Sequence, residues 1–140
     1  MSYTAIVDYG MGNLHSVAKA VEKMGGKAKI SAHAAQIRQA ERVIFPGVGA
    51  FGDCMRALDE RELRQAVLDA AANKPFLGVC LGMQLLMDNS EEHGFHQGLG
   101  LLPGQVRQFA PNLHWQQERL KIPHMGWNQV LQHSAHPLWQ

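Results

Sequence analysis

The residue with the strongest chemical character in this sequence is Cys80, at the centre of Gly78-Val79-Cys80-Leu81-Gly82. The two glycines flank it at the spacing of a nucleophile elbow, in which a strand turns sharply into a helix and presents a reactive side chain. Glycine avoids the crowding that a side chain would cause in such a turn. The first helical turn has unpaired N–H groups, which favour a thiolate over a thiol. The pattern therefore predicts a cysteine nucleophile.

A buried structural role is the alternative for any cysteine, because a free cysteine usually behaves as a small apolar side chain. For Cys80, the apolar strand before it and the Leu85-Leu86 pair after it favour the nucleophile. Cys54 has no such frame, and we expect it to be structural. The sequence has no Cys-x-x-Cys pair, which argues against a disulfide framework or a zinc site and suits a reducing compartment.

The composition limits the class of protein. The 140 residues are 46% hydrophobic and 18% charged, which fits one globular domain over residues 1–140. The 13 basic and 12 acidic residues create no basic field for nucleic acid or an anionic membrane surface. No apolar run approaches the roughly 18 residues of a membrane span, and the N-terminus lacks the cationic start of a signal peptide. We therefore expect a cytoplasmic protein with no nucleic-acid or membrane partner.

The elements that must position Cys80 alternate between strands and helices. Apolar spacing and turn residues predict strands at residues 3–8, 27–31 and 42–45, and a fourth strand that ends at Cys80. They predict helices at residues 14–24, 34–40 and 53–72. We expect Asn13 and Asp53 to cap helices, a break near Glu60, and a helix after Cys80 that continues towards Met87. This order predicts an α/β fold with an open, mostly parallel sheet and helices on both faces.

The second half of the sequence has weaker signals. Residues 89–104 are polar and rich in glycine, which predicts a loop. Residues 105–109 and 119–122 alternate like exposed antiparallel strands, and residues 129–131 are a further short candidate. We expect a connection at residues 123–128 and the opening of a helix at residues 134–140.

Ligands of an open parallel sheet bind beyond the carboxyl ends of its strands. Three segments should meet there, at residues 9–13, at residues 46–52 and at the cysteine elbow. Acyl transfer needs two N–H donors for the developing oxyanion, and the amide of Leu81 supplies one by its position. The second should come from Gly47, Val48 or Gly49. This glycine-rich loop can turn a peptide unit at low steric cost, so the oxyanion hole can form in the active state only.

Four motifs together carry a family resemblance. The stretches Gly78-Val79-Cys80-Leu81-Gly82-Met83-Gln84 and Pro46-Gly47-Val48-Gly49 resemble class I glutamine amidotransferases. The stretches Asp8-Tyr9-Gly10-Met11-Gly12-Asn13-Leu14 and Pro123-His124-Met125-Gly126-Trp127-Asn128 are similar to the glutaminase subunits of imidazole glycerol phosphate synthases, within that family. The resemblance extends from Tyr3 onward. It implies a flavodoxin-like sheet and one amidotransferase domain.

The resemblance also implies an activity, the hydrolysis of glutamine to glutamate and ammonia through a thioester on Cys80. The oxyanion would be held by the amides of Leu81, Val48 and Gly49. Gln84, one helical turn beyond the nucleophile, and Gly49 would bind the substrate. A solvated helix residue remains the alternative for Gln84. No cofactor and no metal are implied.

The implied partner is a (βα)8-barrel cyclase subunit, which forms a heterodimer with the glutaminase. It would use the ammonia to make imidazole glycerol phosphate and AICAR in histidine biosynthesis. The expected interface residues are polar or large and apolar, namely Asn13, His124, Met125, Trp127 and Asn128. The alternative for Met125 and Trp127 is a place in the core under a turn.

The sequence departs from the family pattern at the catalytic base. The base and the acid that orients it belong to a His-x-Glu segment, whereas here Leu138 follows His136-Pro137. We therefore expect this chain to be the N-terminal portion of the enzyme, with the partner His and Glu beyond Gln140 and the C-terminal part of the fold missing. Such a fragment should be inactive alone.

Other functions remain as alternatives. Gly10-Met11-Gly12 could open a dinucleotide fingerprint, but His15 stands where a glycine is required and Ser31 where an acid is required. His93-x-x-His96 has the spacing of metal ligands without a third ligand. Two alternatives remain. One is a glutaminase that feeds another synthase, and the other is a non-catalytic interaction subunit with a structural cysteine.

Overall fold

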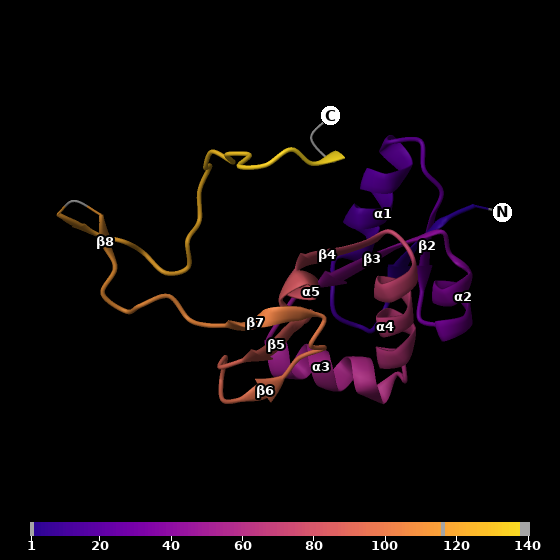
Figure 1. The fold of residues 1–140 in the computed structure, drawn as a ribbon, viewed down its shortest axis with the longest axis horizontal. Coiled ribbons are helices and arrows are strands. Elements are labelled where there is room, and N and C mark those ends of the chain that lie inside the picture. Colours follow the sequence, from indigo (N-terminus) through magenta and orange to yellow (C-terminus); the bar gives the residue numbers. More distant parts are fainter. Residues whose placement is uncertain (1, 116, 138–140) are drawn as a thin grey trace. The chain divides into compact units, whose positions relative to one another are not determined.

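A computed structural model describes residues 2–115 and 117–137 (Figure 1). The chain divides into two compact units, Met1–Gln108 and Phe109–Gln140. No helix within the described residues is long and apolar enough to cross a membrane.

The first unit is built on a four-stranded sheet. Its strands are β1 (Thr4–Val7), β2 (Ala28–Ser31), β3 (Arg42–Gly47) and β4 (Phe76–Cys80), in the order β2-β1-β3-β4. All three neighbouring pairs are parallel. The predicted parallel sheet is confirmed, and the carboxyl ends of its strands lie at one edge.

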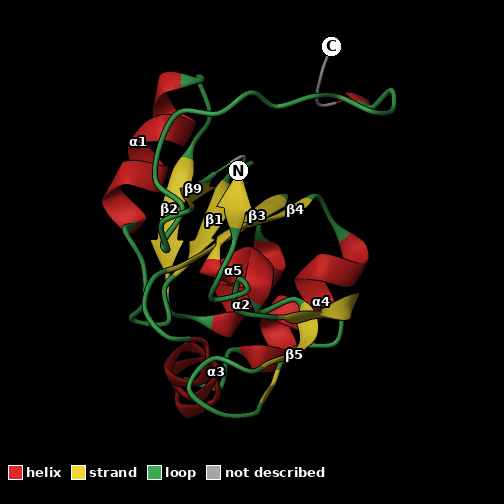
Figure 2. Cartoon of the chain, turned by 90° about the vertical axis from the view of Figure 1, so that its left-hand side faces the viewer, coloured by secondary structure: helices red, strands yellow, loops and turns green. Residues whose placement is uncertain are grey.

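Helices connect the strands on both faces of this sheet. They are α1 (Leu14–Lys23), α2 (Ala34–Gln39), α3 (Phe51–Glu60) and α4 (Arg64–Asn73). α1 lies on one side of the strands, and α2 and α4 lie on the other (Figure 2). The main core forms on the second side, where alternate residues of the central strands, Ala5, Val7, Val43 and Phe45, are buried against these helices.

The start of α1 confirms the predicted cap. The Asn13 side-chain oxygen accepts a hydrogen bond from the Ser16 amide at 3.3 Å. The break between α3 and α4 is likewise confirmed, since α3 ends at Glu60 and α4 begins at Arg64. In the first eighty residues the apolar spacing therefore predicts which strands and helices occur and in what order.

The loop after β3 is shorter than predicted. β3 continues to Gly47, because Pro46 lies beyond the last pairing with β1, at Ile44, and its missing N–H costs no ladder bond there. The Asp53 cap is wrong, since α3 begins two residues earlier, at Phe51. The amide of Phe51 instead donates to the Glu92 carboxylate at 2.7 Å, a contact from a distant segment.

The structure after the elbow differs most from the prediction. α5 covers only Leu81–Gln84, and a second sheet of order β6-β5-β7 replaces the predicted loop. Its strands are β5 (Met87–Ser90), β6 (His96–Gln97) and β7 (Leu102–Val106). β7 pairs parallel to β5, so the antiparallel strand predicted at 105–109 is also wrong. Backbone pairing produces these strands despite their polar composition.

The second unit has little regular structure. An antiparallel pair, β8 (His114–Trp115) and β9 (Glu118–Arg119), is its only ladder within the described residues. The strands predicted at 119–122 and 129–131 are absent there, apart from Arg119 in β9. The helix predicted at 134–140 falls partly on residues 138–140, which lie outside the described residues.

Candidate active site

Cys80 ends β4 with a strained backbone. Its φ is +55° and its ψ is −123°, a conformation that residues other than glycine rarely adopt. Its side chain is exposed, and α5 begins at the next residue, Leu81. The predicted strand-turn-helix elbow is therefore present, and it presents the thiol at the surface.

The two glycines of the elbow are required by packing. A Cβ atom on Gly82 would lie 1.9 Å from the Phe45 carbonyl oxygen, and one on Gly78 would lie 2.8 Å from the Met83 Cα atom. Both contacts involve backbone that cannot easily shift. The sharp turn at Cys80 thus depends on close approach of α5 to the ends of β3 and β4.

The end of β3 lies beside the nucleophile. Gly47 is the register partner of Cys80, and a Cβ atom on Gly47 would lie 2.6 Å from the Gly82 amide nitrogen. Val48 and Gly49 follow directly, and both are exposed. Gly49 has a φ of +116°, which favours glycine. The structure therefore brings the predicted oxyanion segment and the elbow to one edge of the sheet.

A hollow opens at this same edge. It has a volume of about 470 Å³ and is lined by residues from the loops after β1 and β3, namely Gly10, Met11, Gly12, Asn13 and Val48. These loops follow neighbouring parallel strands, so their meeting agrees with the position expected for ligands of such a sheet.

Two buried polar side chains donate hydrogen bonds to the end of β3 and to the loop after it. The Tyr9 hydroxyl donates to the Pro46 carbonyl at 2.8 Å, and the Cys54 thiol donates to the Val48 carbonyl at 3.6 Å. Burial raises the pKa of both Tyr9 and Cys54 above their ordinary values. Sequence reasoning missed this contact of Tyr9 and treated Cys54 as structural, because no local pattern shows which carbonyl a buried side chain will meet.

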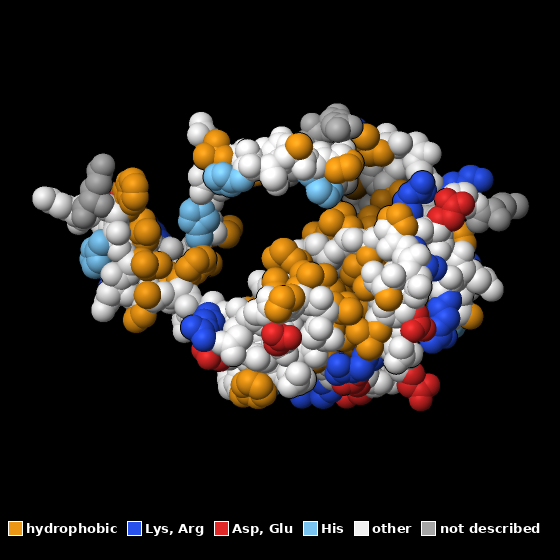
Figure 3. Space-filling view, viewed as in Figure 1, with side chains coloured by type: hydrophobic (Ala, Val, Ile, Leu, Met, Phe, Trp, Pro, Cys, Tyr) orange, Lys and Arg blue, Asp and Glu red, His pale blue; other side chains and the backbone are white. Residues whose placement is uncertain are grey.

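The predicted substrate residue Gln84 is half-buried at the end of α5, and both its role in substrate binding and the alternative of a solvated helix residue stay predictions. Next to the elbow, apolar side chains gather over β4 and α5 (Figure 3). The exposed ones are Leu77, Val79 and Met83. The surroundings of the nucleophile are therefore apolar on one side.

The predicted interface residues other than Asn13 lie in the second unit. The Asn128 side-chain amide donates to Nε2 of His124 at 3.3 Å. Met125 is 86% exposed and Trp127 is fully exposed, so the alternative of core residues is wrong within the structure of this unit. Their role as an interface stays a prediction.

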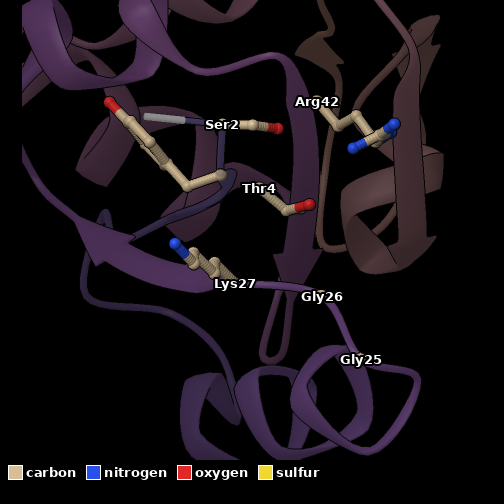
Figure 4. Close-up of a pocket in the computed structure, with 7 residues that line it drawn as sticks. Ser2, Thr4, Gly25, Gly26, Lys27 and Arg42 are labelled. Carbon is tan, nitrogen blue, oxygen red and sulfur yellow. The ribbon is translucent and has the colours of Figure 1, made fainter.

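A second hollow, of about 330 Å³, lies at the opposite, amino-terminal edge of the sheet (Figure 4). Thr4 lies between Lys27 and Arg42 in this view, at the starts of three neighbouring strands. This second hollow is therefore separate from the elbow, which lies at the carboxyl edge of the sheet. Within the described residues, no group of three or more His, Cys, Asp and Glu side chains is placed to hold a metal ion.

Comparison with known proteins identifies relatives of this chain. Residues 5–140 match the family described as glutamine amidotransferase class-I. The chain is 51% identical over 140 residues to "Imidazole glycerol phosphate synthase subunit HisH" of Pseudomonas syringae, a match that covers 99% of this chain and 66% of the relative. It is 54% identical over 144 residues to the subunit of the same name from Nitrosospira multiformis, covering 100% of this chain and 68% of the relative. The chain therefore belongs to the class-I glutamine amidotransferase family.

Proposed function

We propose that this protein hydrolyses glutamine to glutamate and ammonia, with Cys80 as the nucleophile. The observation that carries the proposal is the exposed, strained Cys80 at the end of β4, level with Gly47 of β3. A positive φ at a non-glycine residue costs stability and persists at sites where the side chain must be presented in one direction. The family membership supports glutamine as the substrate.

In the proposed reaction, the Cys80 sulfur attacks the side-chain carboxamide carbon of glutamine, and the C=O π electrons move to the oxygen. The amides of Leu81 and of Val48 or Gly49 hold this oxyanion. The thiol proton goes to the general base, which passes it to the nitrogen as the C–N bond breaks, and ammonia leaves. Water attacks the thioester, glutamate is released, and the thiol regains its proton. Gln84 and Gly49 hold the substrate in this scheme.

The general base belongs to a different segment from the nucleophile in our proposal. The ring nitrogens of His114 and His124 form hydrogen bonds within the second unit, with Asn112 and Asn128. We assign the base and its orienting acid to a His-x-Glu segment, which does not occur within the 140 residues. Without its base, a cysteine retains only the contribution of the elbow and the oxyanion donors.

We further propose that the ammonia passes to a (βα)8-barrel cyclase subunit, in a heterodimeric imidazole glycerol phosphate synthase of the cytoplasm. The names of the relatives support this partner. The exposed Met125 and Trp127, with His124 and Asn128, offer an apolar docking loop with polar flanks. Asn13 lines the hollow beside Val48, and we place the approach of the ammonia acceptor there. Residues 1–140 form one amidotransferase domain in this proposal.

Covalent labelling tests the proposed nucleophile. A diazoketone analogue of glutamine should modify Cys80, as mapped by mass spectrometry, and excess glutamine should protect it. Cys54 is an internal control, because it is buried and should stay unmodified. Equal labelling of both cysteines, or none at Cys80, would favour the non-catalytic interaction subunit instead.

A test with the cyclase separates the two glutaminase hypotheses. If the protein feeds imidazole glycerol phosphate synthase, adding the barrel cyclase and its ligand should raise glutamate release. Labelling at Cys80 without any response to this cyclase would point to a glutaminase of another class I amidotransferase.

A further inference from the structure

Tyr9 and Cys54 are buried polar side chains with no part in the reaction as described so far. Both are fully buried; Tyr9 donates to the carbonyl of Pro46, at the end of β3, and Cys54 donates to the carbonyl of Val48, in the loop that follows. Tyr9 belongs to the segment after β1, which ends at Val7, and Cys54 belongs to the first turn of α3. Side chains from two separate segments therefore bind the backbone on both sides of Gly47, the last residue of β3.

The two side chains act on peptide units on either side of Gly47. Tyr9 binds the carbonyl of Pro46, and Cys54 binds the carbonyl of Val48. In a planar trans peptide, the C=O and N–H groups point in opposite directions. The amide of Gly49 shares its peptide unit with the Val48 carbonyl, so it faces away from Cys54. The orientations of the loop amides are thus set by donors in the core.

Close packing around Gly47 leaves the backbone between the two bound carbonyls little room to move. A Cβ atom on Gly47 would lie 2.7 Å from the Tyr9 hydroxyl oxygen and 3.0 Å from the Leu81 carbonyl carbon. The Tyr9 hydroxyl therefore lies close to the glycine that pairs with Cys80. We expect a change at this hydroxyl to affect the backbone beside the nucleophile.

We propose that Tyr9 and Cys54 are positioning residues, which fix the carbonyls of Pro46 and Val48 so that the Val48–Gly49 segment presents an amide to the oxyanion. The proposal rests on the glutaminase function proposed above. Each residue acts through the loop backbone and touches neither glutamine nor the reacting atoms. The peptide unit between Gly47 and Val48 lies between the two fixed carbonyls, so any turn of the loop is confined to that unit.

Both donors keep their protons under ordinary conditions. The largest cause of the raised pKa is burial in each case; for Tyr9 the neighbouring Cys54 raises the pKa further, and Cys80 adds a smaller increase. An O–H or S–H group can hold a carbonyl only while it is protonated. The buried environment therefore preserves the hydrogen bonds on which the loop orientation depends.

The test uses substitutions that remove single donors from the purified protein. Tyr9→Phe removes the hydroxyl and keeps the ring, Cys54→Ala removes the thiol, and Cys54→Ser restores a donor at the same place. Tyr3→Phe is the matched control, because the Tyr3 hydroxyl donates to a backbone carbonyl, that of Gln36, at 2.6 Å in the α2 region. Thermal unfolding confirms that each variant is folded.

The measurement compares two reagents at Cys80. A chloromethyl ketone analogue of glutamine places a carbonyl oxygen where the oxyanion forms, whereas iodoacetamide reports only on the thiol. We expect Tyr9→Phe and Cys54→Ala each to lower the maximal rate of labelling by the chloroketone about ten-fold, less than loss of an oxyanion donor itself. The chloroketone concentration that gives the half-maximal labelling rate should stay unchanged. The rate of labelling by iodoacetamide should also stay unchanged. Cys54→Ser and Tyr3→Phe should retain the wild-type rates.

Two results would overturn the proposal in distinguishable ways. If the chloroketone fails to label wild-type Cys80 while iodoacetamide succeeds, the proposed glutaminase function is wrong and the positioning role falls with it. If the wild type is labelled but Tyr9→Phe and Cys54→Ala stay within two-fold of it, or Tyr3→Phe is slowed equally, only the positioning role is wrong. Should Tyr9→Phe not fold, the Cys54→Ala and Cys54→Ser pair decides alone.

Discussion

Gly47 of β3 and Cys80 of β4 are register partners in a parallel ladder, and this pairing sets the geometry of the candidate site. Because both strands end at this pair, the loop after one strand and the elbow after the other leave the sheet at the same level. The packing of Gly82 against the Phe45 carbonyl holds the elbow in this place. The position of the nucleophile is thus tied to backbone contacts between neighbouring strands.

Substitution of Gly82 tests the importance of this contact. Gly82→Ala would put a methyl group 1.9 Å from the Phe45 carbonyl oxygen, so the elbow must move. We expect the free energy of unfolding to fall by about 3 kcal/mol or more, as for other overpacked sites, and labelling of Cys80 by glutamine analogues to be lost. Urea unfolding measures the first effect and mass spectrometry the second.

Gly25→Ala is the control for this substitution. Gly25 also has a positive φ, of +79°, but a methyl group there would meet nothing within 4 Å. Only backbone strain should remain, which costs about 1 kcal/mol. A Gly82→Ala protein as stable as Gly25→Ala would contradict the close packing at the elbow.

The strain at Cys80 predicts a trade of stability against activity. Cys80→Gly removes the side chain that resists a φ of +55°, which relieves about 1 to 3 kcal/mol of backbone strain. The greater conformational entropy of glycine in the unfolded chain offsets somewhat less than this gain. We expect the glycine variant to gain about 1 kcal/mol in unfolding free energy while losing all reaction with glutamine. Cys80→Ala keeps the Cβ atom and should show no such gain. Equal stabilities of the two variants would argue that the elbow carries no strain.

The first eighty residues could be predicted well because their elements are regular. Ala5, Val7, Val43 and Phe45 lie on strands whose apolar residues are buried between helices, and this pattern is visible in the sequence. The glycine spacing around Cys80 likewise predicted the elbow, because a turn this tight excludes side chains at both flanks.

The strands after the elbow and the start of α3 could not be predicted, because they depend on contacts between distant segments. β5 contains Asp88, Asn89 and Ser90, which have low strand propensity, yet it pairs with β7 more than ten residues later. α3 begins at Phe51 because the Glu92 carboxylate, from the turn after β5, accepts its amide. No local pattern encodes these pairings, so the sequence predicted a loop for one and a wrong cap for the other.

The raised pKa values of Tyr9 and Cys54 predict a loss of stability at alkaline pH. The ordinary values are 10.0 and 9.0, and burial raises both in the folded state. The unfolded chain therefore releases these protons first as the pH rises. The stabilising contribution should be complete below about pH 9 and should decline as the pH rises towards the folded-state pKa values, by at most about 1.4 kcal/mol per pH unit for each group.

Tyr9→Phe provides the check on this alkaline effect. It removes one of the two groups, so the free energy of unfolding in urea should fall less steeply above about pH 10 than in the wild type. Cys54→Ala should flatten the curve from about pH 9 upwards. Parallel curves for the wild type and both variants would show that neither proton is held by the folded state.

The exposed tryptophans of the second unit allow a test of the proposed partner surface. We expect Trp127→Ala to weaken binding of the barrel cyclase at least ten-fold in a calorimetric titration, because large aromatic anchors dominate interface energies. Trp115→Ala is the matched control, since Trp115 is also exposed in this unit but lies in β8, outside the proposed docking loop. Trp127 is fully exposed, so its removal should leave the unfolding free energy nearly unchanged. If both variants bind the barrel cyclase with equal affinity, the segment around Trp127 is not the interface.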